Sequence, residues 1–227
     1  MPGQRGLAIL TAACLALSCS DSSGPSGTVS AFTNDPAGDQ FGSDSVQPDL
    51  VKVTVTRDAA GIDVAIDLSA NAVSLLTDTI HGVGGFVDFD VDQDSTTGFA
   101  TWTDLFRPTG STGMGEEYYL QFLSFQVDST VSVHDTTGAL TGSVRPVFSG
   151  KRVSFRITKA MLGNDDGFVN VSVVVGNNIE ATDIAPNAGH IKVGGTGAVA
   201  AYSPTPGIRP LRVGKWEGRW TVKTPSR

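Results

Sequence analysis

The chain has 227 residues, with 23 acidic against 16 basic side chains and a formal net charge of −7. This acidic balance argues against a nucleic-acid partner, because Lys and Arg supply most of the attraction to phosphate. Both cysteines lie at or before Cys19, so the rest of the chain has neither a disulfide nor a thiolate metal site.

The N-terminus has the features of a bacterial export signal. Arg5 precedes an apolar run over residues 6–17, which is too short to span a bilayer. The run leads into Ala-Leu-Ser-Cys19, which resembles the lipobox of bacterial lipoproteins, where the cysteine is acylated and the preceding bond is cut. We therefore expect a signal peptide at residues 1–18 and lipid attachment at Cys19. Cleavage before Cys14, or ordinary secretory cleavage nearby, is the alternative.

The residues that follow the predicted signal peptide indicate how the protein is attached to the cell envelope. Residues 19–30 are rich in Ser, Gly and Asp, which is typical of a flexible polar tether. Ser20 directly after the cysteine is the pattern of outer-membrane lipoproteins in bacteria with two membranes. No second apolar run follows, so the lipid alone would attach the protein to the cell envelope.

Short alternating runs dominate the rest of the chain. Residues 49–57 alternate between apolar and polar, the turn at 58–61 follows, and residues 62–68 alternate again, which predicts a β-hairpin. Short helical pieces are predicted only at 71–79 and 158–162. Further strands are predicted at residues 84–91, 99–106, 117–127, 130–134, 143–148, 152–157 and 168–175.

Many short strands with very little helix predict an all-β, jelly-roll-like antiparallel sandwich over residues 31–193. A parallel sheet would need crossover helices that the sequence lacks. Residues 194–227 are rich in Gly and Pro and then basic. They form either a final strand near 215–222, closed by Trp216 and Trp220, or a loosely held tail.

The densest group of acidic residues begins at Asp88. Asp88, Asp90 and Asp92 alternate with apolar residues, so an extended chain places the three carboxylates on one face, and Asp94 follows. Carboxylates this close repel one another unless a cation neutralises them. Hard oxygen donors suit Ca²⁺, which takes six to eight oxygen ligands, better than zinc or iron.

The spacing of this segment excludes an EF-hand loop. A loop that starts at Asp88 needs Gly at position six and Glu at position twelve, but Gln93 and Phe99 stand there. The register that starts at Asp90 also fails. The alternative is an acidic strand end that is exposed to solvent and binds no metal. If an ion is bound, its role is either to stiffen the loop or to bridge the protein to a ligand.

The same segment carries a family resemblance. Asp-Phe-Asp-Val-Asp-Gln-Asp-Ser-Thr-Thr-Gly, at residues 88–98, resembles a loop of secreted bacterial β-sandwiches similar to DOMON domains and family-nine carbohydrate-binding modules. Further matching pieces are Asp-Pro-Ala-Gly-Asp at 35–39, Pro-Asp-Leu at 48–50, Gly-Glu-Glu-Tyr at 115–118 and Asn-Asp-Asp-Gly at 164–167.

The resemblance implies a site as well as a fold. It makes Glu117 the donor from a neighbouring strand, with Asp35, Asp39 and Asp183 as weaker ligand candidates. Trp102 and Tyr118 are the aromatic residues of the matched region that could contact a ligand, although aromatic residues on strands more often belong to the core. The implied cation ligands are Asp88, Asp90, Asp92, Asp94 and Glu117.

No nucleophile-and-base motif, zinc-protease motif or phosphate loop is present, so we do not expect an enzyme. The first functional hypothesis is a cell-surface binding module, for polysaccharide, with Ca²⁺ ordering the loop beside its site. The second is a structural or assembly lipoprotein that docks on envelope proteins, with calcium purely structural. The basic segment 209–227 motivates the second hypothesis.

Overall fold

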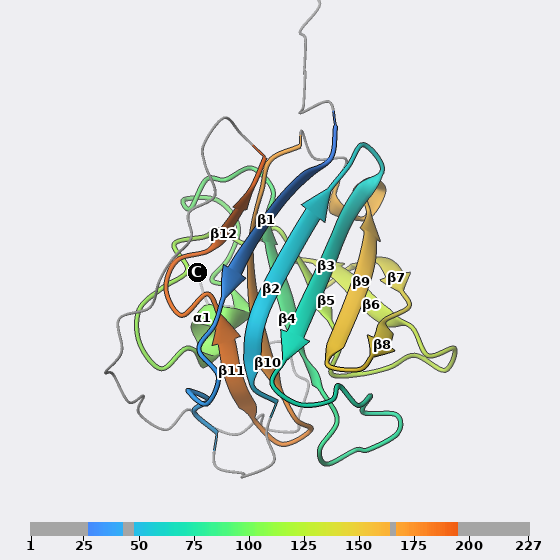
Figure 1. The fold of residues 1–227 in the computed structure, drawn as a ribbon. Coiled ribbons are helices and arrows are strands. Elements are labelled where there is room, and N and C mark those ends of the chain that lie inside the picture. Colours follow the sequence, from blue (N-terminus) through green and yellow to red (C-terminus); the bar gives the residue numbers. More distant parts are fainter. Residues whose placement is uncertain (1–26, 43–47, 164–166, 195–227) are drawn as a thin grey trace, which may run out of the picture.

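The computed structural model describes residues 27–42, 48–163 and 167–194, and these form two antiparallel sheets packed face to face (Figure 1). The predicted all-β sandwich is therefore confirmed. The first sheet has the strand order β1 (Val29–Asn34), β2 (Leu50–Arg57), β3 (Gly61–Leu68), β9 (Arg152–Thr158) and β8 (Val147–Ser149).

The second sheet contains seven strands. Strand β12 (Ile191–Val193) pairs with the first half of β10, on the same side that β11 occupies along the second half. The order of the other strands is β11 (Ala181–Ala185), β10 (Val169–Gly176), β4 (Gly84–Asp90), β5 (Tyr118–Gln121), β6 (Val131–Asp135) and β7 (Leu140–Val144).

The main core lies between the two sheets and follows the alternation of the sequence. In β3, Ile62, Val64 and Ile66 are fully buried, whereas Asp63 between them is exposed. Val87 and Phe89 of β4, in the second sheet, belong to the same hydrophobic cluster as these three residues. Burial of such side chains contributes about 1.5–3 kcal/mol each, which makes this interface the principal source of stability.

Strands β4 and β10 are buried on both faces. Their second face is covered by residues 91–117, which include the short helix α1 (Trp102–Phe106), and carries a smaller apolar cluster around Phe86 and Val174. Trp102 stacks on Phe86 with ring centroids 4.2 Å apart. The acidic side chains of β4 lie on this covered face, between the sheet and the overlying chain.

Several element predictions were wrong in detail. The predicted strand at 99–106 is wrong: Phe99 makes only an isolated bridge to Glu116, and residues 102–106 form helix α1. Thr101 caps this helix by accepting a hydrogen bond from the Asp104 amide, and the Trp102 and Thr103 amides donate to Asp88. Residues 71–79 form turns and one bridge rather than a helical piece. The predicted strand at 143–148 is divided between β7 and β8. Strands β1, β11 and β12 were not predicted.

The 3-10 helix Lys159–Leu162 agrees with the predicted helical piece at 158–162. Strand β1 begins inside the segment predicted as a tether, at Val29. The signal peptide, Cys19 and the predicted final strand near 215–222 lie outside the described residues. In the described part of the chain, no helix is long and apolar enough to cross a membrane.

Candidate metal centre

Three carboxylates meet where β4 ends and β5 begins. Strand pairing sets Phe89 opposite Tyr118, and the Glu117 amide donates to the Phe89 carbonyl at 3.0 Å. This register puts Glu117 beside Asp90, the last residue of β4. One carboxylate oxygen from each of Asp90, Asp92 and Glu117 lies within 4.8 Å of the other two, so this group could hold a metal ion.

The loop after β4 is folded back onto these carboxylates. The Thr97 hydroxyl lies 2.7 Å from Asp92 Oδ2 and 3.3 Å from Glu117 Oε1. The Val91 amide donates to Glu117 Oε2 at 3.0 Å, and the Asp94 amide donates to Asp92 Oδ1 at 2.9 Å. These contacts hold two of the three carboxylates in place without a charged partner.

Asp90 carries the clearest sign of a missing partner. Its side chain is fully buried, and Oδ2 accepts a hydrogen bond from the Asn170 amide at 2.9 Å, but Oδ1 has no hydrogen-bond partner. A buried carboxylate oxygen without a donor costs about 1–3 kcal/mol or more, so such groups are rarely left unpaired. A divalent cation among the three carboxylates would satisfy this oxygen and offset the mutual repulsion.

The raised pKa of Glu117 indicates that no positive charge in the described part of the chain balances the three carboxylates. Burial, followed by the charges of Asp92 and Asp90, raises the pKa of Glu117 to about 7. Nearby negative charges disfavour ionisation of a carboxyl, whereas a bound cation favours it. The group is therefore arranged to take up positive charge.

Gly98 lets the loop approach the site. Its φ is 66°, and a Cβ there would lie 2.3 Å from the Glu116 carbonyl oxygen and 2.5 Å from Glu117 Oε1. No side chain can be placed at that position without moving the loop. The Thr97-Gly98 pair thus brings a hydroxyl to Asp92 and Glu117 while it keeps the backbone clear of them.

The structure separates Asp88 from this group. Asp88 lies under helix α1, where Oδ2 accepts hydrogen bonds from the Thr103 amide at 2.9 Å, the Thr103 hydroxyl at 2.6 Å and the Ser172 hydroxyl at 3.0 Å. Its side chain also hydrogen-bonds to Glu116, whose pKa is raised well above its ordinary value by burial and by the charge of Asp88. Burial also raises the pKa of Asp88, so the two carboxyl groups form a buried pair under α1, apart from the carboxylates of Asp90, Asp92 and Glu117.

Asp94 also lies outside the carboxylate group. It is exposed and accepts from the amide and hydroxyl of Thr96, which lower the pKa of Asp94. Of the five predicted ligands, the structure brings together Asp90, Asp92 and Glu117. Sequence reasoning missed Asn170, whose signal is that it alternates, like Ser172, with the valines of β10.

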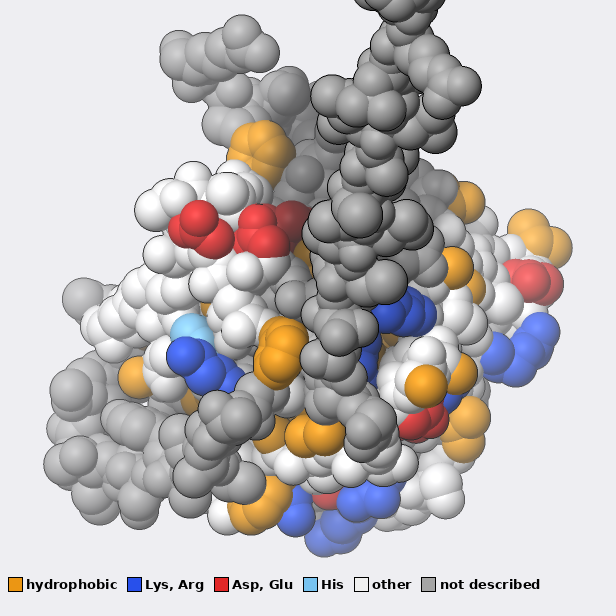
Figure 2. Space-filling model, turned by 90° about the horizontal axis from the view of Figure 1, so that it is seen from above, with side chains coloured by type: hydrophobic (Ala, Val, Ile, Leu, Met, Phe, Trp, Pro, Cys, Tyr) orange, Lys and Arg blue, Asp and Glu red, His pale blue; other side chains and the backbone are white. Residues whose placement is uncertain are grey.

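Trp102 and Tyr118 do not form a joint aromatic surface. Trp102 packs in the smaller cluster outside the second sheet, with Tyr119 at a ring-centroid distance of 5.6 Å. Tyr118 packs against the main core on the opposite face. In the view of Figure 2, the hydrophobic side chains of described residues are scattered among polar ones rather than joined in a continuous surface.

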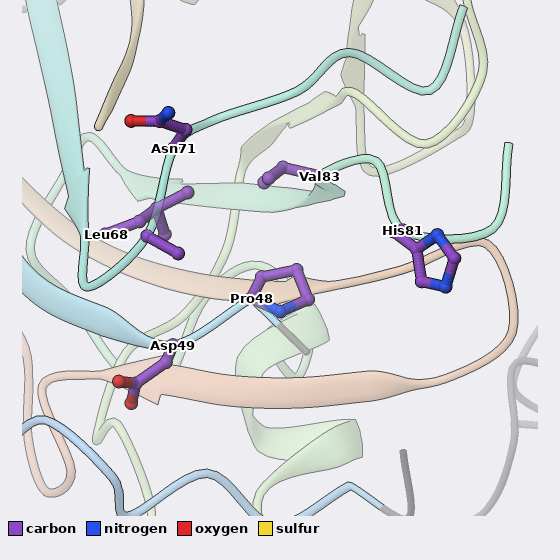
Figure 3. A pocket seen from close by; sticks show the side chains of 7 residues that line it. Pro48, Asp49, Leu68, Asn71, His81 and Val83 are labelled. Carbon is purple, nitrogen blue, oxygen red and sulfur yellow. The ribbon is translucent and has the colours of Figure 1, made fainter. Parts of the chain in front are cut away.

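Asp35, Asp39 and Asp183 form a second group that could hold a metal ion, with one oxygen from each within 4.8 Å of the others. Nearby, a small hollow is lined by seven residues, among which the Asp49 carboxylate points away from the hollow toward the Gly38 amide (Figure 3). We assign it no function because its polar groups do not converge. The lining residues are Pro48, Asp49, Leu68, Ala70, Asn71, His81 and Val83.

The fold and the site define an antiparallel β-sandwich with two carboxylate groups, each suited to a metal ion. In comparisons with known proteins, no family model matches this chain and no curated protein matches it significantly.

Proposed function

We propose that the chain is an exported lipoprotein of the cell envelope whose β-sandwich is a non-catalytic binding module stabilised by Ca²⁺. The observation that carries the calcium part is the buried, unpartnered Oδ1 of Asp90 beside Asp92 and Glu117. An all-oxygen donor set of this kind favours a hard cation. Ca²⁺ fits better than Mg²⁺, because irregular loop ligands suit its flexible coordination rather than a strict octahedron.

Thermal unfolding of the full-length protein tests the calcium site. A ligand that binds only the folded state stabilises it by about 2.7 kcal/mol at a hundredfold excess over the dissociation constant. We expect the melting temperature to rise with Ca²⁺ and to fall back with chelator. Asp92→Asn should make this response smaller.

Asp94→Asn is the matched control, because Asp94 lies two residues away in the same loop but outside the carboxylate group. Asn can still accept the hydrogen bond that closes the turn. Asp94→Asn should keep the calcium response. If calcium leaves the melting temperature of the wild-type chain unchanged, the metal site is wrong.

The proposed ligand is polysaccharide. Support comes from the resemblance of residues 88–98 to secreted carbohydrate-binding sandwiches, and from the position of the loop at the end of β4, where calcium would order it. We expect the protein to bind a glycan on an array in the presence of Ca²⁺ and to lose that binding with chelator. Binding to no glycan would favour the assembly role instead.

A further inference from the structure

The second carboxylate group lies where the edges of the two sheets meet. Asp35 directly follows β1 of the five-stranded sheet, and Asp39 stands in the loop after it. Asp183 is at the centre of β11, an edge strand of the seven-stranded sheet. The C-terminal end of β1 and strand β11 lie side by side in Figure 1, in agreement with the short distances among the three carboxylates.

Hydrogen bonds leave two oxygens of this group unpartnered. The Asn187 side-chain amide donates to Asp35 Oδ1 at 2.9 Å and to Asp39 Oδ2 at 2.8 Å. The remaining oxygens, Asp35 Oδ2 and Asp39 Oδ1, are buried and have no hydrogen-bond partner. Asp35 as a whole residue is only 7% exposed. Asn187 thus draws the two carboxylates together and leaves one free oxygen on each.

Asp183 supplies the third donor from a fixed position. Its Oδ2 accepts from the Leu50 amide at 2.7 Å, and its Oδ1 accepts from the Ile184 amide at 2.8 Å. Leu50 begins β2, so Asp183 already joins one sheet to the other. Each carboxylate oxygen has a further lone pair, which allows a cation to bind without breaking these hydrogen bonds.

The carboxylates of this group act on one another electrostatically. Burial is the main cause that raises the pKa of Asp35 to about 8, and the charges of Asp39 and Asp49 add to it. Burial and the charge of Asp35 likewise raise the pKa of Asp183. Buried acidic groups of one sign require protons or a cation.

The loop that carries Asp39 is held against β11 by its backbone. The Phe41 amide donates to the Thr182 carbonyl at 2.8 Å, and the Gly38 amide donates to both oxygens of Asp49, at 2.9 and 3.1 Å. The donor positions therefore exist in the folded chain before any ion arrives, which lowers the entropy cost of binding.

We propose that Asp35, Asp39 and Asp183 form a second Ca²⁺ site, separate from the one at the end of β4, that ties the edge of one sheet to the edge of the other. The two sites share no residue, and this inference does not depend on the proposed function.

Counting bound calcium tests the two sites separately. Full-length protein is stripped with chelator and titrated with CaCl₂ by equilibrium dialysis. We expect two ions per wild-type chain, one in Asp39→Asn and one in Asp92→Asn, with none in the double variant. Asp128→Asn, which removes an exposed aspartate outside both groups, is the control and should bind two.

Each result decides one proposal. If the wild-type chain binds one ion that Asp92→Asn abolishes, the second site is overturned and the first stands. If Asp39→Asn abolishes a single ion instead, the second site stands and the calcium part of the proposed function falls. Binding of no calcium overturns both.

Asp35→Asn distinguishes a lost ligand from a folding defect. In chelator this variant should be at least as stable as the wild-type chain at pH 8, because it removes a buried negative charge. In Ca²⁺ it should be less stable than the wild-type chain. A variant that is destabilised to the same extent in both conditions would contradict the proposal.

Amide hydrogen exchange shows which part of the chain calcium stabilises when it binds at the second site. In Asp92→Asn, calcium should slow amide exchange in peptides covering residues 29–42 and 177–193, which carry the two sheet edges. In Asp39→Asn, calcium should leave these peptides unchanged.

Discussion

Two aspartates on the same face of one strand have different roles in this protein. Asp88 is covered by helix α1 and accepts hydrogen bonds from Thr103 and Ser172, which satisfy its carboxylate. Asp90, at the strand end, has one oxygen without a donor. The difference comes from the chain that covers each residue, because the side-chain types are identical. Asp88 therefore anchors α1, and Asp90 belongs to the group of carboxylates that could hold a metal ion.

The raised pKa values predict how stability depends on pH without calcium. Glu117, with a pKa of about 7, binds its proton more tightly in the folded chain than in the unfolded chain, where the value is near 4.5. Its contribution to stability is therefore full below pH 4.5 and is lost as the pH rises through 7. Asp35, at about 8, acts in the same direction.

Urea unfolding at pH 5 and pH 8 measures this effect. In chelator we expect lower stability at pH 8 than at pH 5. Added Ca²⁺ should stabilise the protein at pH 8 and have little effect at pH 5, because it binds the ionised carboxylates. Glu117→Gln should reduce both responses. Equal stability at the two pH values in chelator would contradict the assigned electrostatics.

At the scale of elements, the segment from Val91 to Glu116 turns an ordinary strand end into a site. It leaves β4, folds back through Thr97-Gly98, forms α1 over the sheet and returns to β5. The α1 amides of Trp102 and Thr103 donate to the carboxyl group of Asp88, so hydrogen bonds hold the helix to the strand. The geometry of the candidate metal centre thus depends on how tightly this segment packs.

Two glycines with the same backbone conformation allow a matched test of that packing. Gly98 and Gly113 both have φ of 66°, but a Cβ would clash only at Gly98, since nothing lies within 4 Å of it at Gly113. We expect Gly113→Ala to cost about 1–2 kcal/mol for the left-handed conformation alone. Gly98→Ala should cost more and should also weaken calcium binding. Urea unfolding and calcium titration measure the two effects, and equal costs would contradict the close approach.

At the scale of the molecule, the sandwich joins strands that are distant in sequence. Strand β10 pairs with β4 on one side and with β11 and β12 on the other. The group of Asp90, Asp92 and Glu117 joins the end of β4 to the start of its neighbour β5. The group of Asp35, Asp39 and Asp183 joins the end of β1 to the distant strand β11. A cation at either place would therefore stabilise long-range pairing, which is costly in loop-closure entropy.

The variant Cys19→Ser tests whether a lipid on Cys19 attaches the whole protein to the cell envelope. We expect the wild-type protein in the membrane fraction, with an N-terminal mass that includes acyl chains. The variant should lose the acyl mass and move to the soluble fraction, because the sequence has no second apolar run to hold it. Retention of Cys19→Ser in the membrane fraction would contradict lipid anchoring.

The sequence by itself determined the fold class and the acidic strand end. Alternation over residues 49–57 and 62–68 predicted β2 and β3 because solvent and core select opposite faces of a strand. The same rule placed Asp88, Asp90 and Asp92 in an acidic row. It could not predict β11, whose residues are buried on both faces, so that no alternation marks them.

Only the tertiary structure decided which acids act together. Asp88 and Asp92 are equally near to Asp90 in the sequence, and Asp94 is equally near to Asp92, yet helix α1 removes Asp88 and a turn removes Asp94. Strand pairing brings in Glu117 instead. Likewise, the grouping of Asp35 with Asp183 depends on two sheet edges that meet after a separation of more than half the chain. Alternation fixes a side chain's face, but contacts between distant segments fix its neighbours.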